Sequence, residues 1–82
     1  MKHIDLKHAV ESPGTNNFTC LLFRLILKAD AGNRILLARG FSVEVQMAEI
    51  YKDECPYQEG TFGQVVDYKR IEEMVMEDMD NE

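Results

Sequence analysis

The 82-residue sequence contains only two cysteines and no long run of apolar residues. Two cysteines are too few for the disulfide framework that stabilises many small secreted domains. No apolar segment approaches the roughly 20 residues that a membrane-spanning helix needs. Because residues 1–5 are not followed by the apolar core of a signal peptide, we expect a cytoplasmic protein with no membrane partner.

Basic residues are also scarce, with 9 lysines and arginines against 15 acidic residues. Residues 67–82 carry seven acids and two bases, a net charge of −5, whereas residues 1–66 have a net charge of only −1. Sequence-independent binding to nucleic acid needs clustered lysine and arginine, and an anionic membrane surface attracts the same residues. The charge balance therefore disfavours both kinds of partner.

No motif for catalysis or cofactor binding is complete in this sequence. Ser12 and Ser42 fall at expected turn and cap positions, which explains them without catalysis. The paired carboxylates at 72–73 and 77–78 are expected on a solvated helix rather than in a pocket. Residues 59–65 resemble a kinase glycine-rich loop, but its first glycine is replaced by Gln58 and the other kinase motifs are absent. We predict no catalytic or cofactor-binding residue and no enzyme.

Four residues that could ligate a metal are scattered along the chain: His3, His8, Cys20 and Cys55. They show neither C-x-x-C nor H-x-x-x-H spacing, so we predict no metal site and surface positions for the histidines. Cys20 lies in an apolar helical pattern and is expected to pack as a small hydrophobic residue. A role for the Cys55 thiol, in the loop before Pro56, stays open.

The apolar residues of the chain are concentrated between positions 17 and 51. With Asn17 as the N-cap, one face of a helix is expected, because apolar residues recur at i, i+3, i+4, i+7 and i+11: Phe18, Leu21, Leu22, Leu25 and Ala29, with Ile26 widening the face. A second apolar ridge formed by Cys20, Phe23 and Leu27 follows the same period. A helix that is apolar on two sides is usually sandwiched between elements or contacts a partner.

Further boundaries follow at helical spacing. Asp30 is a second predicted N-cap, Gly40 suits a left-handed C′ position with Phe41 packed over Leu36, and Ser42 begins the next helix. Asp67 caps a last helix, which carries an acidic end. The predicted helices are 18–29, 31–39, 43–52 and 68–78.

We therefore predict one all-α domain, a bundle of about four short helices. Residues 1–16 are expected to form an irregular arm and linker, 17–52 the helical body, 53–66 a loop, and 67–82 the acidic C-terminal helix and tail. Alternating apolar residues over 18–51 leave a second interpretation open, an α+β fold in which this stretch is an antiparallel β-meander followed by the C-terminal helix.

Apolar residues in excess of one helix face predict an interaction surface. A ridge at Phe23 and Leu27 that the short chain cannot cover would form an exposed patch, which a homodimer or another protein partner would bury. The adaptable side chains of Met74 and Met79 on the last helix are the other candidates. We expect a surface for self-association or protein binding at these four residues.

The stretch 17–51 contains N-F-T, L-x-L-K-A-D, A-G-N-R, L-A-R-G-F and V-E-V in order. In this combination it resembles small uncharacterised proteins of phages and prophages, a resemblance that implies a bacterial or phage origin and no activity. The expected function is that of a small acidic, non-catalytic interaction or accessory protein. The alternative is a small helical nucleic-acid-binding module, for which Arg24, Lys28, Arg34 and Arg39 could supply the basic face.

Overall fold

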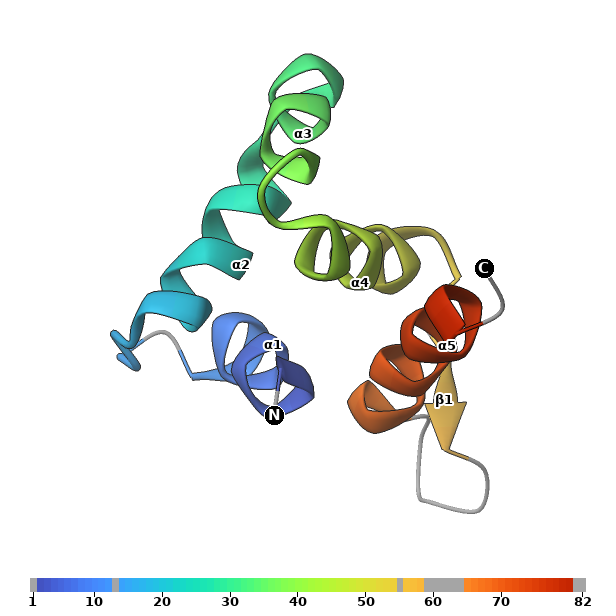
Figure 1. Ribbon diagram of the computed structural model, residues 1–82. Helices are drawn as coiled ribbons and strands as arrows, with labels where there is room; N and C mark the ends of the chain where they lie inside the picture. Colours follow the sequence, from blue (N-terminus) through green and yellow to red (C-terminus); the bar gives the residue numbers. More distant parts are fainter. Residues whose placement is uncertain (1, 13, 55, 59–64, 81–82) are drawn as a thin grey trace.

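The computed structural model describes residues 2–12, 14–54, 56–58 and 65–80, which form a helical fold with one short hairpin (Figure 1). In chain order the elements are α1 (Lys2–Glu11), α2 (Phe18–Lys28), α3 (Ala31–Ala38), α4 (Ser42–Asp53), β1 (Tyr57–Gln58), β2 (Val65–Val66) and α5 (Tyr68–Asp80). The predicted all-α class is confirmed, and the stretch 18–51 consists of helices rather than a β-meander.

Three helices begin where their capping side chains predict. The Oδ1 atom of Asn17 accepts a 2.8 Å hydrogen bond from the backbone N–H of Cys20, and Asp30 Oδ1 accepts one of 2.8 Å from Asn33. Asp67 Oδ1 accepts a 3.0 Å bond from the N–H of Arg70 at the start of α5. Each side chain thus satisfies one of the free N–H groups of a first helical turn.

The N-terminal arm is a helix, and the prediction of an irregular segment is wrong. The apolar residues of α1 show little helical periodicity in the sequence, because Leu6 is its only fully buried residue. Contacts to distant elements stabilise it instead: Lys2 Nζ lies 3.0 Å from Glu44 Oε2, and Arg24 Nη2 donates a 2.8 Å bond to the Ser12 carbonyl just beyond its C-terminus. Packing of this kind, more than intrinsic propensity, makes a ten-residue helix stable.

The junction between α3 and α4 differs from the predicted left-handed cap. The backbone φ of Gly40 lies outside the left-handed region. The N–H groups of Arg39 and Gly40 donate to the carbonyls three residues earlier, at 3.3 and 3.2 Å, so the last turn of α3 tightens as a 3₁₀ helix does. The chain changes direction at Phe41, whose φ and ψ of −134° and 52° are not helical.

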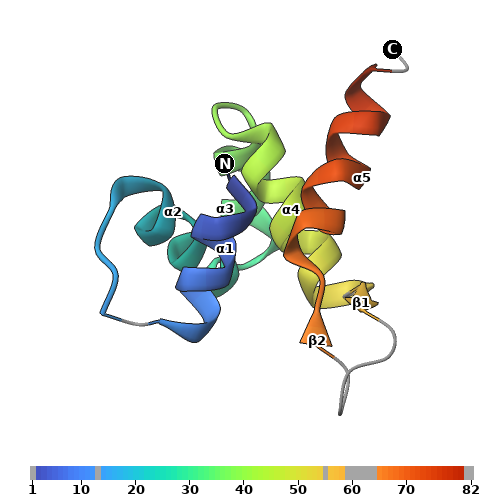
Figure 2. The same cartoon turned by 90° about the horizontal axis from the view of Figure 1, so that it is seen from below.

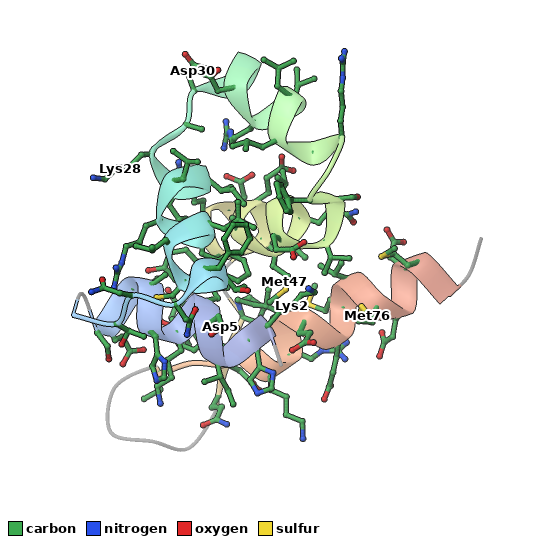
Figure 3. All side chains as sticks on the ribbon, turned by 60° about the vertical axis from the view of Figure 1, so that its left-hand side comes forward. Lys2, Asp5, Lys28, Asp30, Met47 and Met76 are labelled. Atoms are coloured by element: carbon green, nitrogen blue, oxygen red, sulfur yellow. The ribbon has the colours of Figure 1, made fainter. Side chains whose placement is uncertain are left out.

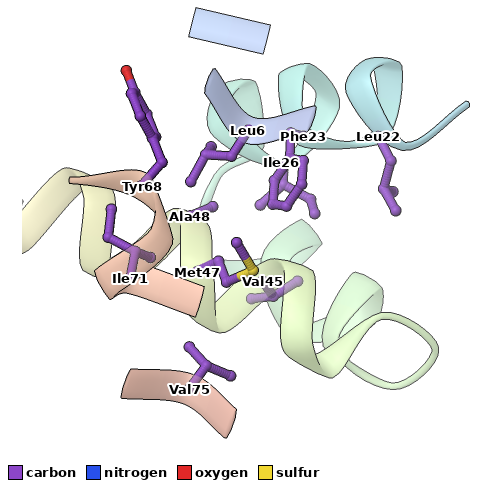
Figure 4. Close-up of a cluster of buried hydrophobic side chains, with 10 residues drawn as sticks. All are labelled: Leu6, Leu22, Phe23, Ile26, Val45, Met47, Ala48, Tyr68, Ile71 and Val75. Atoms are coloured by element: carbon purple, nitrogen blue, oxygen red, sulfur yellow. The ribbon is translucent and has the colours of Figure 1, made fainter. Parts of the chain in front are cut away.

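Four helices enclose the core in the spatial order α1, α2, α4, α5, with α5 returning to α1 (Figures 1 and 2). The core is one cluster of buried side chains, to which all four helices contribute (Figure 4). The cluster consists of Leu6, Leu22, Phe23, Ile26, Val45, Met47, Ala48, Tyr68, Ile71 and Val75. The remaining helix, α3, packs on α4 and projects from the ring (Figure 1).

The connection between α4 and α5 contains the hairpin. Tyr57 pairs with Val66 and Gln58 with Val65 in an antiparallel register, so the stretch predicted as a loop contains one short ladder. The rings of Tyr51 and Tyr68 stack at a centroid distance of 6.1 Å and join the two helices. Cys55 and most of the glycine-rich stretch, residues 59–64, lie outside the described residues.

Candidate interaction surface

The two apolar sides of α2 exist, but the structure buries the side that was expected to be exposed. Phe23 is 0% exposed in the core, and Leu27 is half-buried against the same cluster. The prediction of an accessible ridge at these two residues is therefore wrong in its placement. Helix α1, which the sequence pattern did not reveal, packs along α2, and its Leu6 belongs to the same buried cluster as Phe23.

The apolar face of α2 that was expected to pack inward is only partly buried: Leu22 and Ile26 lie in the core, whereas its other large side chains are exposed. Phe18 is 70% exposed, Leu25 is 55% exposed, and Leu21 between them is also exposed. At one end of the stripe, the centroid of the Phe18 ring lies 6.2 Å from that of Phe41, which precedes α4. Three large apolar side chains thus follow one another along the outer surface of α2.

Helix α3 extends this exposed apolar surface. All eight of its residues are described and none is buried. Ile35 and Leu36 are both exposed, Leu36 by 58%. Leu37 and Ala38 are half-buried and pack against the core, so α3 is anchored by these two side chains while Ile35 and Leu36 stay in water.

A groove joins the two helices at their shared end. It has a volume of about 610 Å³ and lies between the last turn of α2 and the length of α3. Its lining consists of Leu25, Lys28, Ala29, Asp30, Asn33, Leu36 and Leu37. We call the stripe and the groove together the α2–α3 face, defined by Phe18, Leu21, Leu25, Leu36 and Leu37.

Charge is distributed unevenly around this face. Residues 17–41 contain four bases and one acid, a net charge of +3, whereas residues 42–82 contain three bases and twelve acids, a net charge of −9. Lys28 and Asp30 lie at the junction of the two helices (Figure 3). The Asp30 carboxylate caps α3, so it already serves the N-terminal N–H groups of that helix.

One of the four basic residues of this segment has a structural role. Arg24 Nη2 donates to the carbonyl of Ser12 at 2.8 Å, and Arg24 Nε lies 3.5 Å from the carbonyl of Ala9. The guanidinium therefore binds the C-terminal carbonyls of α1, where the helix dipole favours a cation. The other cations of this segment are Lys28, which lines the groove, Arg34 within α3, and Arg39 directly after α3.

The predicted methionines on α5 occupy a separate surface. Met79 is 44% exposed, while Met74 is half-buried and lines an acidic groove of about 390 Å³ with Gln46, Glu54 and Glu77. Helices α2 and α5 lie on opposite sides of α1 and α4 (Figures 1 and 2). The four candidate residues therefore do not form one surface.

His3 and Glu72 form a close pair of titratable groups that joins two helices. His3 Nδ1 lies 2.6 Å from Glu72 Oε1, and the backbone N–H of His3 donates to the same oxygen at 3.0 Å. Burial alone would raise the pKa of Glu72, but these bonds from His3 outweigh it and hold the pKa below its ordinary value. The pair joins the start of α1 to α5.

Other groups that could carry chemistry are accounted for by contacts within the fold. Ser42 Oγ accepts a 2.9 Å bond from Gln46, and Cys20 is fully buried. The described residues contain no group of three histidine, cysteine or acidic side chains placed to hold a metal ion. Within the same part of the chain, no helix has the length and apolar character needed to cross a membrane.

The exposed α2–α3 face is thus the candidate binding surface among the described residues. Sequence periodicity identified its apolar side chains but assigned them to the core. Comparison of the chain with protein-family models, with curated proteins and with solved structures found no match.

Proposed function

We propose that this chain is a small acidic protein without catalytic activity, which acts by binding another protein in an accessory or regulatory role. The α2–α3 face is the surface that binds. The observation that carries the proposal is that α3 leaves Ile35 and Leu36 mostly exposed and has no fully buried residue. A partner that covers this helix would bury apolar side chains that the chain itself leaves in water.

The energetic argument supports a protein partner. Burial of apolar surface contributes roughly 25 cal/mol per Å², and contiguous exposed apolar patches are typical of interaction sites. Leu25 and Leu36 line one groove, so a single inserted side chain would contact both. The groove also combines leucines with the polar and charged side chains of Lys28, Asp30 and Asn33, and a hydrophobic centre with a polar rim is the usual arrangement of a protein–protein interface.

A nucleic-acid-binding module is the second candidate. Helices α2 and α3 are joined by Ala29 and Asp30 alone, a tight connection that resembles the turn of a helix-turn-helix unit. Against it, a recognition helix presents polar side chains to base edges, whereas α3 presents Ile35 and Leu36. Because Arg24 is bound to α1, the basic face is also smaller than the sequence suggests.

The resemblance of residues 17–51 to small phage and prophage proteins supports a bacterial or phage origin, and we place the protein in the cytoplasm. An accessory protein of that kind would find its partner among the proteins of the bacterial host or of the phage.

Capture from bacterial lysate with three immobilised proteins tests the proposed function. The wild type is compared with Leu25→Glu/Leu36→Glu, which adds two charges to the α2–α3 face, and with Ile4→Glu/Met76→Glu, which adds two charges at other exposed apolar positions. We expect a protein that the wild type and the Ile4/Met76 variant retain and the Leu25/Leu36 variant loses. Identical captured sets from all three would contradict the proposal, and salt-sensitive retention of duplex DNA would favour the second candidate.

A further inference from the structure

We infer that the partner of the α2–α3 face is an amphipathic helix whose residues flanking the apolar stripe are acidic. This inference rests on the proposed function and adds the chemical class of the partner. Two observations on the described residues support it, the shape of the face and the charges around it.

The shape of the face suits a helix laid along it. The stripe from Phe18 to Ala29 extends for about 16 Å, at roughly 1.5 Å per residue, which corresponds to about three turns of a partner helix. Its exposed side chains recur at i, i+3 and i+7, and the groove between Leu25 and Leu36 continues the stripe onto α3. Apolar residues at i, i+3, i+4 and i+7 of an incoming helix are the usual ligands of such a groove.

The charge of the face selects among amphipathic helices. Lys28 lines the groove, and its side chain points away from the body of the molecule (Figure 3). Arg34 lies within α3, which supplies the other wall of the groove, and the exposed Arg39 directly follows that helix. The one acid of this segment, Asp30, is engaged as the cap of α3. Glutamates and aspartates beside the apolar stripe of the partner would meet these cations, whereas lysines would be repelled.

A second copy of this chain fits the face less well than a foreign helix. The chain has its own acidic helix, α5, but Tyr68, Ile71 and Val75 on its apolar side are already buried in the core. Only Met76 and Met79 of α5 remain as large exposed apolar side chains. Two copies with a net charge of −6 each also repel one another at low ionic strength.

Two labelled peptides of about 20 residues test the inference by fluorescence anisotropy. Both carry leucine at i, i+3, i+4 and i+7, and they differ only in whether glutamate or lysine fills the flanking positions. We expect the wild type to bind the glutamate peptide at least about tenfold more tightly than the lysine peptide. Raising the ionic strength should reduce the difference, because salt screens exposed charges.

Protein variants then assign the binding to the face. Leu25→Glu/Leu36→Glu should weaken binding of the glutamate peptide by at least about tenfold, whereas Ile4→Glu/Met76→Glu should not. Lys28→Glu/Arg34→Glu should reverse the preference between the two peptides. Circular dichroism of each variant verifies that it is folded, which is expected since the substituted side chains are not buried.

Several results would overturn the inference. Equal binding of both peptides, a preference for the lysine peptide, or binding of neither would refute the acidic partner while leaving capture of a protein by the α2–α3 face intact. Binding that Leu25→Glu/Leu36→Glu leaves unchanged would place the site elsewhere. A wild-type dimer in sedimentation, made monomeric by the same variant, would identify a second copy as the occupant instead.

Discussion

His3 Nδ1 lies 2.6 Å from Glu72 Oε1, so the first turn of α1 is joined to α5 by a short hydrogen bond between partly buried side chains. These helices are far apart in sequence, and their contact closes the ring of four helices around the core. The carboxylate accepts a second bond from the His3 backbone N–H, which fixes the first turn of α1 on α5.

This pair gives the stability of the protein a defined pH dependence. The pKa of Glu72 is lowered in the folded state, so the carboxylate contributes stability above its ordinary pKa of 4.5, and the contribution is lost as pH falls through the lower folded pKa. Glu72→Gln should reduce the free energy of unfolding by about 1 kcal/mol at neutral pH, a typical net value for a hydrogen bond. The difference from the wild type should shrink in acid below pH 4.5.

Urea denaturation of both proteins between neutral and acidic pH measures this difference. Glu73→Gln is the matched control, because its carboxylate is half-exposed and lies 3.7 Å from Arg70 at the surface. A difference between Glu72→Gln and the wild type that stays constant throughout the acid range would rule out the role given to Glu72.

Truncation of a side chain should reduce stability strongly on one side of α2 and little on the other. Phe23→Ala should cost about 3–5 kcal/mol, since its side chain is fully buried in the core. Phe18→Ala should change the free energy of unfolding by about 0.5 kcal/mol or less, because its side chain is mostly in water. Chemical denaturation of the two variants distinguishes the sides, and a larger loss for Phe18→Ala would show that the opposite face of α2 is buried.

Gly40→Ala should leave stability unchanged or raise it by about 0.4–1 kcal/mol. The φ angle of Gly40 is not left-handed, and an added Cβ would meet no heavy atom within 4 Å. Alanine would also reduce the conformational freedom of the unfolded chain. A melting temperature several degrees below that of the wild type would instead support the left-handed cap that the sequence predicts.

Helix α3 should exchange its amide hydrogens faster than α4. None of its residues is fully buried, and only Leu37 and Ala38 pack against the core among its apolar side chains, whereas α4 buries Glu44, Val45, Met47 and Ala48. Local opening costs little free energy where few apolar contacts are lost. Native-state hydrogen exchange measures the protection of each helix. Equal protection of α3 and α4 in the free protein would argue against the claim that α3 is covered only when a partner binds.

Local signals in the sequence were sufficient to place three helix starts. Asn17, Asp30 and Asp67 each cap a backbone N–H three residues ahead, an interaction that depends only on neighbouring residues. The core side of α5 was equally local, since Tyr68, Ile71 and Val75 follow one helical period. Features that depend only on residues close together in the sequence can therefore be predicted from it.

The exposed surface was not readable in this way. Both sides of α2 are apolar, and the choice between them depends on α1, whose single buried residue, Leu6, leaves almost no periodic signal. The ionic partners of α1 at Glu44 and Glu72 are remote in sequence. Without α1, the more regular stripe at Phe18, Leu21 and Leu25 was assigned to the core, and the true core residue Phe23 to the interface.

The central claim, that the α2–α3 face is where the protein binds its partner, is tested most directly by site-specific photocrosslinking in bacterial cells. A photoreactive amino acid replaces Leu36 in one protein and Ile4 in the other, two exposed apolar positions on different helices. We predict a covalent adduct with another protein from position 36 and none from position 4. No adduct at position 36, or the same adduct from both positions, would contradict the claim.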